Sequence, residues 1–178
     1  PQFHLSMQSG CDTVLARMKR KYTTEEYMES LERLRNAFPG CAITTDMIVG
    51  FPGETEEEFE KSLSFIRQCR FADMHIFPYS RRPGTPAAEM PGQLSNAVKE
   101  ERSRRAIAVA QEMSETYRRS LTGTVQAVLV EGMEGEHSVG HAMNYVKIYI
   151  PGAYPRNEIQ TVAVKSLYGD GVTGEVIQ

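Results

Sequence analysis

The residues that could do chemistry gather at the ends of three short apolar runs. Gln8-Ser9-Gly10 follows the first run, Asp46 lies in the second, which contains ITTDMIVG, and the third ends in Phe77-Pro78-Tyr79-Ser80. In parallel β/α architectures the loops at the C-terminal ends of the strands form the active face. The three run ends are therefore predicted to form one binding face.

Asp46 is the charged residue that this pattern directs toward the face. A strand period of two places four residues on one side: Thr44, Asp46, Ile48 and Gly50. Burying an unpaired charge costs on the order of several kcal/mol, so Asp46 needs a partner such as a cation, a ligand hydroxyl or an ammonium group. A structural aspartate bonded to the backbone or to an arginine is the alternative interpretation.

Other motifs around these ends are less specific. GFPGE, residues 50–54, is either an anion-binding nest or a tight turn before a capped helix. A basic run covers residues 17–21, and Arg20 could fold back over the rim of the sheet, where a guanidinium suits a carboxylate; a solvated face is the alternative. The four histidines lack metal-ligand spacing, and no Ser-His-Asp set or Walker-type loop is present. The residues alone therefore assign no catalytic group and no metal ligand.

Composition limits the classes of protein to consider. The chain has 178 residues, 40% of them hydrophobic, with a net charge of −3 that gives no overall reason to expect nucleic acid. The three cysteines are widely spaced, which excludes a disulfide framework and a close-spaced metal motif. No apolar run approaches the roughly 20 residues of a membrane helix, and the first residues lack the pattern of a signal peptide. We expect a cytoplasmic protein without a membrane segment.

The first 120 residues alternate strand and helix signals. The predicted elements are a strand over Phe3–Gln8, a helix from the capping box Thr23/Glu26 to Phe38, a strand over Ala42–Val49, a helix from the capping box Thr55/Glu58 to Arg70, a strand over residues 72–80, a loop over Arg81–Gln93 and a helix over Ser95–Ser120. This series predicts a parallel sheet with helical crossovers. Three such strands are few for a stable sheet, so we expect a partial (β/α) barrel and a chain that is a fragment.

The character of the sequence changes at Leu121. Five short strand candidates follow, separated by Gly, Asn and Asp, with no helix signal among them. Five strands in fewer than sixty residues predict a small closed or partly open barrel. The chain is therefore divided into an α/β domain, residues 1–120, and an all-β domain, residues 121–178.

Three long motifs, in order, carry a resemblance to a known family. FHLSMQSGCDTVLARMKRKYTTEEY, AITTDMIVGFPGETEEEF and FPYSRRPGTPAA resemble the second half of the radical S-adenosylmethionine (SAM) domain of the methylthiotransferases. The segment from Leu121 resembles their TRAM domain, a small OB-like RNA-binding barrel. QSGCD with RKYTTEEY, and GHAMNYVKIYIPG in the barrel, are most similar to the MtaB-type branch. That branch adds a methylthio group to carbon 2 of N6-threonylcarbamoyladenosine, beside the anticodon of certain tRNAs.

The resemblance implies polar contacts to S-adenosylmethionine. Gln8 and Asp46 match positions expected to contact its ribose and amino group. Arg20 matches a position expected to bind its carboxylate, as a guanidinium suits.

It also implies an adenine pocket. Ile48 would pack on the adenine, and the backbone around Phe77 and Pro78 would read the edge of the base. Two 4Fe-4S clusters belong to the family, but the Cys-x3-Cys-x2-Cys motif and the three further cysteines that hold them are absent from this sequence. Cys11, within SGCD, is not a cluster ligand. We expect this chain alone to be inactive.

The implied partner is tRNA, at its anticodon stem-loop, although residues 121–178 carry three Lys or Arg against six Asp or Glu. A few placed residues could suffice: Arg118, Arg119, Asn144, Tyr145, Lys147, Arg156 and Lys165. An ordinary barrel with a solvated face is the alternative. The sulfur donor is not indicated by the sequence.

Other functions remain open at this point. A sibling enzyme could act on isopentenyladenosine in tRNA or on an aspartate of a ribosomal protein. The chain could also be a stand-alone RNA-binding module whose half-sheet supports the barrel. Porphyrin-type radical enzymes have motifs similar to QSG and DMIVGFPGET, but the predicted C-terminal barrel argues against assigning this chain to them.

Overall fold

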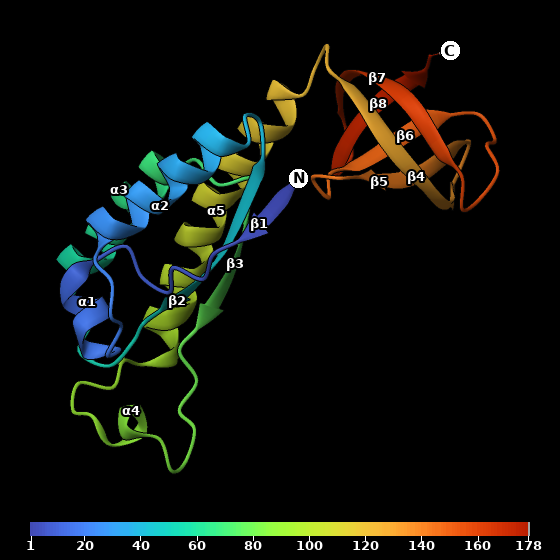
Figure 1. Ribbon diagram of the computed structural model, residues 1–178. Coiled ribbons are helices and arrows are strands. Elements are labelled where there is room, and N and C mark those ends of the chain that lie inside the picture. The colour runs from blue at the N-terminus through green and yellow to red at the C-terminus, as the bar shows by residue number, and fades with distance from the viewer. Residues whose placement is uncertain (178) are drawn as a thin grey trace. The chain divides into compact units, whose positions relative to one another are not determined.

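A computed structural model describes residues 1–177 (Figure 1). They divide into two compact units. One unit spans His4–Ser114, and the other comprises Pro1–Phe3 and the residues from Glu115 onward. None of the helices among the described residues is long and apolar enough to cross a membrane.

The α/β elements follow the predicted order. They are β1 (Gln2–His4), α1 (Asp12–Arg17), α2 (Thr24–Ala37), β2 (Ala42–Val49), α3 (Glu56–Cys69), β3 (Asp73–Pro78), α4 (Pro86–Glu89) and α5 (Asn96–Ser120). The sheet has the order β1-β2-β3, and β2 pairs with β3 in parallel. This confirms the predicted parallel sheet with helical crossovers.

Local sequence signals explain where the helices begin. Thr23 and Thr55 cap α2 and α3, and both reciprocal capping boxes are formed, with Glu26 and Glu58 respectively.

The two helices lie side by side (Figure 1). Tyr27 of α2 packs edge-on against Phe65 and Phe71, with ring centroids 6.4 and 6.3 Å apart. The apolar faces of both helices are thereby buried together.

Strand β2 has two unlike faces. Thr45, Met47 and Val49 are buried, whereas Asp46 and Ile48, on the alternate face, are only partly covered. The period-of-two prediction is therefore confirmed here, and the polar, half-open face is the one that carries Asp46.

The first strand is shorter than predicted. β1 ends at His4, and Gln8 rejoins β2 through a single parallel bridge to Met47. Gln8 has a φ of 69°, a left-handed conformation that extended backbone does not contain. The predicted strand over Phe3–Gln8 was wrong beyond His4 for this reason.

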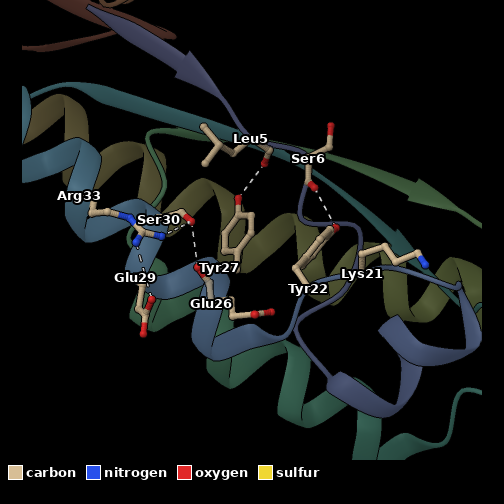
Figure 2. A pocket seen from close by; sticks show the side chains of 9 residues that line it. All are labelled: Leu5, Ser6, Lys21, Tyr22, Glu26, Tyr27, Glu29, Ser30 and Arg33. Atoms are coloured by element: carbon tan, nitrogen blue, oxygen red, sulfur yellow. Dashed lines mark hydrogen bonds and ion pairs between the residues drawn. The ribbon is translucent and has the colours of Figure 1, made fainter.

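Tyrosine hydroxyls hold the segment between His4 and Gln8. Tyr27 donates to the carbonyl of Leu5 at 2.7 Å, and Tyr22 donates to that of Ser6 at 3.1 Å (Figure 2). Tyr22 also donates to the carbonyl of Met7 at 2.8 Å. Burial raises the pKa of both tyrosines, so each remains a neutral donor. Side chains thus replace part of the missing strand pairing.

The loop predicted over Arg81–Gln93 contains the short helix α4. Pro86 occupies the first turn after the N-cap residue Thr85, where its missing N–H costs nothing. A helix of four residues is too short to show periodicity, so the sequence pattern did not indicate it.

The second unit contains a closed five-stranded barrel. Its strands are β4 (Val125–Glu134), β5 (His137–Ala142), β6 (Lys147–Pro151), β7 (Ile159–Tyr168) and β8 (Gly171–Val176), in the closed order β4-β5-β6-β8-β7. The core contains ten buried residues: Leu121, Val128, Val130, Ala142, Val146, Ile148, Ile150, Val162, Val164 and Val172. All five predicted strands are present, and the barrel is closed.

One close approach shows why the barrel needs a glycine. At Gly140 of β5 a Cβ atom would lie 1.9 Å from the carbonyl oxygen of Leu129 in β4. The two strands meet here in the register Leu129↔His141 and Val130↔Gly140. Only a residue without a side chain fits this crossing.

Candidate binding site at the strand ends

A hollow of about 540 Å³ lies at the C-terminal ends of β2 and β3. Its lining is Gln8, Asp46, Ile48, Phe77, Pro78, Tyr79, Ser80, Arg82, Thr85 and Ala87. Five of the six residues that the sequence suggested for the cofactor are among them. The prediction that the strand ends form one face is confirmed in this geometric sense.

The sixth residue, Arg20, lines a neighbouring hollow of about 310 Å³. Three residues border both spaces: Ile48, Thr85 and Ala87. Arg20 is exposed and forms no ion pair with any residue that the structure describes. The two hollows thus offer a guanidinium at one end and a carboxylate at the other.

Arg17, from the same basic run, is used differently. Its guanidinium bonds both carboxylate oxygens of Glu58, at 3.0 and 2.5 Å, and Thr13 donates to the same carboxylate. The Arg17 guanidinium lowers the pKa of Glu58 to about 2. Arg17 therefore joins α1 to the capped start of α3 and is engaged within the chain, whereas Arg20 and Lys19 both line the smaller hollow without an ion pair to any described residue.

Asp46 is held by partners that the sequence did not indicate. Its Oδ2 lies 3.2 Å from Nε2 of His4 and accepts a hydrogen bond from the Ser6 hydroxyl at 3.1 Å. The side chain of Asp46 is 27% exposed and that of His4 is 41% exposed. Asp46 thus has partners within the chain, a histidine and a serine, which are neither the expected cation, ligand hydroxyl or ammonium group nor the backbone or arginine of the alternative interpretation.

Gln8 enters the hollow from a strained position. Its N–H donates to the carbonyl of Asp46 and its own carbonyl accepts from the N–H of Ile48, both at 2.9 Å. These two bonds fix a left-handed backbone that a non-glycine residue adopts only at a cost of about 1–3 kcal/mol. The amide side chain of Gln8 is directed by this geometry, since both of its backbone groups are fixed.

Ile48 and Phe77 give the hollow an apolar wall. They are partners in the register of β2 and β3, so their side chains leave the sheet on the same face. Phe77 is 50% exposed although it is a large aromatic residue. An apolar wall beside a few polar groups is the usual composition of a small-molecule site.

The GFPGE motif forms a tight turn. Glu54 is fully buried, and its Oε2 accepts from the N–H of Gly50 at 2.7 Å and from Nη1 of Arg102 in α5 at 2.6 Å. Because the carboxylate of Glu54 occupies the place that an anion would take, the nest interpretation does not hold for Gly50. The buried pair with Arg102 ties the loop after β2 to α5.

Three residues that shape this end of the unit escaped the sequence reasoning: His4, Ser6 and Arg102. His4 and Ser6 are two residues apart in the predicted first strand. The period of two that placed Asp46 on one face of its strand could therefore have placed these two on one face as well. Arg102 lies in a helix rich in charged residues, and nothing in the pattern separates it from its neighbours. Its burial depends on Glu54, which is 48 residues away in the sequence.

In the barrel, the proposed RNA-contacting cations are mostly paired. Lys147 lies 2.7 Å from Glu134 and 3.6 Å from Asp170, and the Glu134 carboxylate raises the pKa of Lys147. Lys165 pairs with Glu175 at 3.1 Å. Arg156 is exposed and forms no ion pair among residues 1–177.

The arginines at the end of α5 are also engaged. Arg119 lies 2.6 Å from Glu115 on the same helix. Arg118 is partly buried and is not free of interactions either. Of the cations suggested for RNA, Arg156 therefore stands apart.

Asn144 and Tyr145 occupy one turn but have opposite environments. Asn144 is buried, with its Oδ1 accepting from the N–H of Val146 at 3.2 Å and its Nδ2 donating to the hydroxyl of Tyr117 at 3.3 Å. Tyr145 is 71% exposed and has a φ of 60°. The amide of Asn144 thus fixes the turn from which the ring of Tyr145 projects.

The donor set at the strand ends fits S-adenosylmethionine better than a metal. Within the described part of the chain, no group of three or more His, Cys, Asp or Glu could hold a metal ion. The two hollows instead combine a carboxylate, an amide, a guanidinium and an apolar wall. These groups match an ammonium group, hydroxyls, a carboxylate and a nucleobase.

Comparisons with known proteins place the chain in a family. Residues 1–66 match the model of the Radical SAM superfamily. The threonylcarbamoyladenosine tRNA methylthiotransferase MtaB of Bacillus subtilis is 41% identical over 182 residues, covering 90% of this chain and 40% of that protein. The chain belongs to the radical SAM methylthiotransferase family.

Other methylthiotransferases are equally similar. The tRNA-2-methylthio-N(6)-dimethylallyladenosine synthase of Acidothermus cellulolyticus is 42% identical over 180 residues, covering 100% of this chain and 35% of that protein. The synthase of the same name from Mycobacterium bovis is 50% identical over 135 residues, covering 76% of this chain and 26% of that protein. The chain thus spans less than half the length of these relatives.

A solved structure confirms the fold of the α/β part. Coproporphyrinogen III oxidase (HemN) of Escherichia coli, a radical SAM enzyme, matches with a TM-score of 0.54 and 20% identity, over 63% of this chain and 26% of that one. The α/β part of the chain therefore has a radical SAM-like partial barrel fold. The closed five-stranded barrel follows it in the sequence.

Proposed function

We propose that this chain supplies the SAM-binding strand ends and the RNA-binding barrel of a tRNA methylthiotransferase. The substrate we favour is N6-threonylcarbamoyladenosine beside the anticodon, modified at carbon 2. The observation that carries the proposal is the convergence of Gln8, Asp46, Ile48, Phe77 and Pro78 on one hollow, with Arg20 in the adjoining one. Family membership supports the same reaction class.

The residues divide the work of holding S-adenosylmethionine. Asp46 and Gln8 take the amino group and the ribose, and Arg20 takes the carboxylate, which a guanidinium binds with two parallel hydrogen bonds. When bound, this cofactor supplies the methyl group and the radical that activates the adenine C–H. The chain's own part is to bind and orient, because a positioned reactant removes much of the entropic barrier.

The adenine lies against the apolar wall in this proposal. Ile48 packs on its face, and the backbone at Phe77 and Pro78 reads its edge. The iron–sulfur clusters of the family are outside this scheme, because the described residues offer no cluster ligands.

The barrel, residues 121–178, is proposed to be a TRAM domain that contacts the anticodon stem-loop. Tyr145 projects from a fixed turn and can stack on an unpaired base, and Arg156 can meet a phosphate. Asn144 serves this contact indirectly by fixing the turn. Lys147, Lys165 and Arg119 would have to leave their carboxylates first.

A second substrate is favoured by a specific observation. Relatives named for dimethylallyladenosine are as similar to this chain as the MtaB relative. The same hollow would serve either substrate, because the cofactor is shared and the modified base differs only in its N6 group.

Mass spectrometry of tRNA nucleosides tests the proposal. Cells that lack the gene should lose the methylthio group from threonylcarbamoyladenosine and regain it with the intact gene. An Asp46→Ala gene should not restore it, whereas Glu57→Ala, an exposed carboxylate on α3, should. Loss from dimethylallyladenosine instead would assign the second substrate. No change in either nucleoside would refute the proposed function.

A further inference from the structure

The smaller of the two strand-end hollows carries positive charge that the chain does not balance. Three cationic side chains line it: Arg17, Lys19 and Arg20. Glu58 neutralises Arg17, but Lys19 and Arg20 are exposed and form no ion pair with any residue from 1 to 177. None of the described residues that line this hollow is an aspartate or a glutamate. Two positive charges therefore lack a counter-charge here.

Most of the remaining lining of this hollow is apolar. It comprises Met18, Ile48, Phe51, Pro86, Ala87 and Met90. Phe51 is buried together with Cys11 and Val14, so this wall is part of a packed core and not a loose surface. A cation beside an apolar wall attracts an anion more strongly than one in open water, because less water screens the two charges. The hollow thus suits a ligand group with a short apolar stem and a negative end.

The hollow drawn in Figure 2 is a contrasting case. Lys21 lines it, two residues after Lys19, together with the carboxylates of Glu26 and Glu29. The remaining cation of its lining, Arg33, lies 3.9 Å from Glu29. Two cations therefore face two carboxylates, and this hollow has no excess charge. The excess at the smaller strand-end hollow is not a general property of the basic run over residues 17–21.

The backbone at Lys19 indicates that its side chain is not there for the fold. Lys19 follows the C-cap residue of α1, and its φ is 56°. Glycine is the usual residue in this left-handed position after a helix, because a Cβ atom is crowded there. A cation is not needed to complement the end of the helix either, since Arg17 already lies in the last turn. The fold alone would therefore be served better by a glycine.

We infer that Lys19 binds the carboxylate of the threonylcarbamoyl group on the substrate adenosine. The inference rests on the proposed function, in which this nucleoside is the favoured substrate and Arg20 has a different ligand group. The threonine part of the N6 group ends in a carboxylate, which is the counter-charge that Lys19 lacks. Standard bond lengths place that carboxylate roughly 5 Å from N6 in the extended group, so the base itself need not enter the smaller hollow.

The same contact makes Lys19 a specificity-determining residue. The dimethylallyl group of the second candidate substrate is a hydrocarbon with no charge. Placed against Lys19, it would displace water from the ammonium without replacing the lost hydrogen bonds, whereas a carboxylate replaces them. Because specificity is a difference between two binding free energies, both effects favour threonylcarbamoyladenosine.

Two anticodon stem-loop RNAs that differ in a single group test the inference. One carries N6-threonylcarbamoyladenosine, and the other carries the same nucleoside with the threonine carboxylate replaced by a carboxamide. All phosphate contacts are the same for both, so they cancel in the comparison. Fluorescence anisotropy with the complete gene product gives the two dissociation constants. The wild type should bind the carboxylate RNA about fivefold more tightly, the equivalent of about 1 kcal/mol, as for an exposed ion pair.

Lys19→Gly separates the charge of the side chain from its effect on the fold. The variant removes the ammonium and places a glycine at a left-handed position, so its melting temperature should be no lower than that of the wild type. Its preference for the carboxylate RNA should fall below about twofold. Lys19→Arg keeps a cation and should keep most of the preference. Lys21→Met, the matched control, removes a cation from the other hollow and should leave the preference unchanged.

The outcomes distinguish this inference from the proposed function. If the complete gene product binds neither RNA, the proposed RNA substrate itself is refuted. If the wild type binds both RNAs equally well, or if Lys19→Gly keeps the fivefold preference, the role of Lys19 is refuted while the proposed function stands. An equal loss of preference in Lys21→Met would also overturn the inference, because the effect would then come from the total charge of the basic run.

Discussion

The two units of this chain differ in which of their charged side chains remain available to bind a ligand. In the α/β unit the strong ion pairs, such as Glu54 with Arg102, lie in the supporting turns and helices, while Arg20 and one oxygen of Asp46 remain available beside the hollows. In the barrel, Lys147 and Lys165 are already paired with the barrel's own carboxylates.

The difference shows what a fold can guarantee. Parallel strands bring their C-terminal ends to one edge of the sheet. Residues at those ends therefore lie close together, whichever side chains the strands carry. The strand topology of a small barrel does not leave an outward-facing cation available for a ligand in this way. A carboxylate on the neighbouring strand can already be paired with it. Lys147 illustrates this, since Glu134 of β4 and Asp170 at the β7–β8 turn both reach it.

The comparison predicts that the α/β unit is most vulnerable at its buried ion pair. Arg102→Ala should lower the free energy of unfolding by about 3–5 kcal/mol, because it leaves the Glu54 charge buried without a partner. Urea unfolding followed by circular dichroism measures the change. The double variant Glu54→Gln with Arg102→Met should be less destabilised than Arg102→Ala alone. Equal losses for the two would show that the buried charge is not the cause.

The barrel should instead be most vulnerable to added volume at its closest strand crossing. Gly140→Ala places a methyl group against the carbonyl of Leu129 and should cost about 1–3 kcal/mol. Gly132→Ala, in the paired strand β4, meets no atom within 4 Å and should change stability by less than about 0.5 kcal/mol. Thermal unfolding of the two variants makes the comparison. Similar melting temperatures would contradict the steric account.

The sequence predicted the features that depend on local signals or on strand topology. Periodicity and capping boxes predicted β2, α2 and α3 closely, because those signals are local. The convergence of Gln8, Asp46 and Ile48 followed from topology.

Contacts between distant segments were not predictable in this way. The bond between His4 and Asp46 joins residues 42 positions apart, and the pairing of Lys147 with Glu134 depends on strand register. Nor did any pattern indicate the left-handed backbone at Gln8, because glutamine is not a residue that favours it. Such features depend on tertiary context that a single sequence does not contain.

A smaller effect is expected from acid at the start of α3. The pKa of Glu58 is lowered from 4.5 to about 2 by its bond to Arg17, so its ion pair stabilises the fold fully above pH 4.5 and is lost as the pH falls toward 2. Glu58→Gln keeps the helix cap but loses the charge, which should cost about 1 kcal/mol near neutral pH.

The difference in unfolding free energy between wild type and Glu58→Gln should therefore shrink between pH 4.5 and pH 2. Urea titrations at several pH values measure it. Glu57→Gln, an exposed neighbour whose partner is Lys61, is the matched control and should show a much smaller difference. A constant gap across this range would mean that the pair with Arg17 does not lower the pKa of Glu58 as described.

The smallest effect concerns the cations of the barrel, and it tests the comparison most directly. Arg156→Gln should weaken binding of an anticodon stem-loop RNA about twofold to threefold and reduce the salt slope by about 1, because a free cation can neutralise one phosphate. Lys147→Gln should change neither quantity measurably, since that ammonium is already neutralised by Glu134. Fluorescence anisotropy at several salt concentrations gives both numbers. If Lys147→Gln weakens binding as much as Arg156→Gln, the carboxylate must release Lys147 when RNA binds, and the contrast between the two units no longer describes the RNA-bound state.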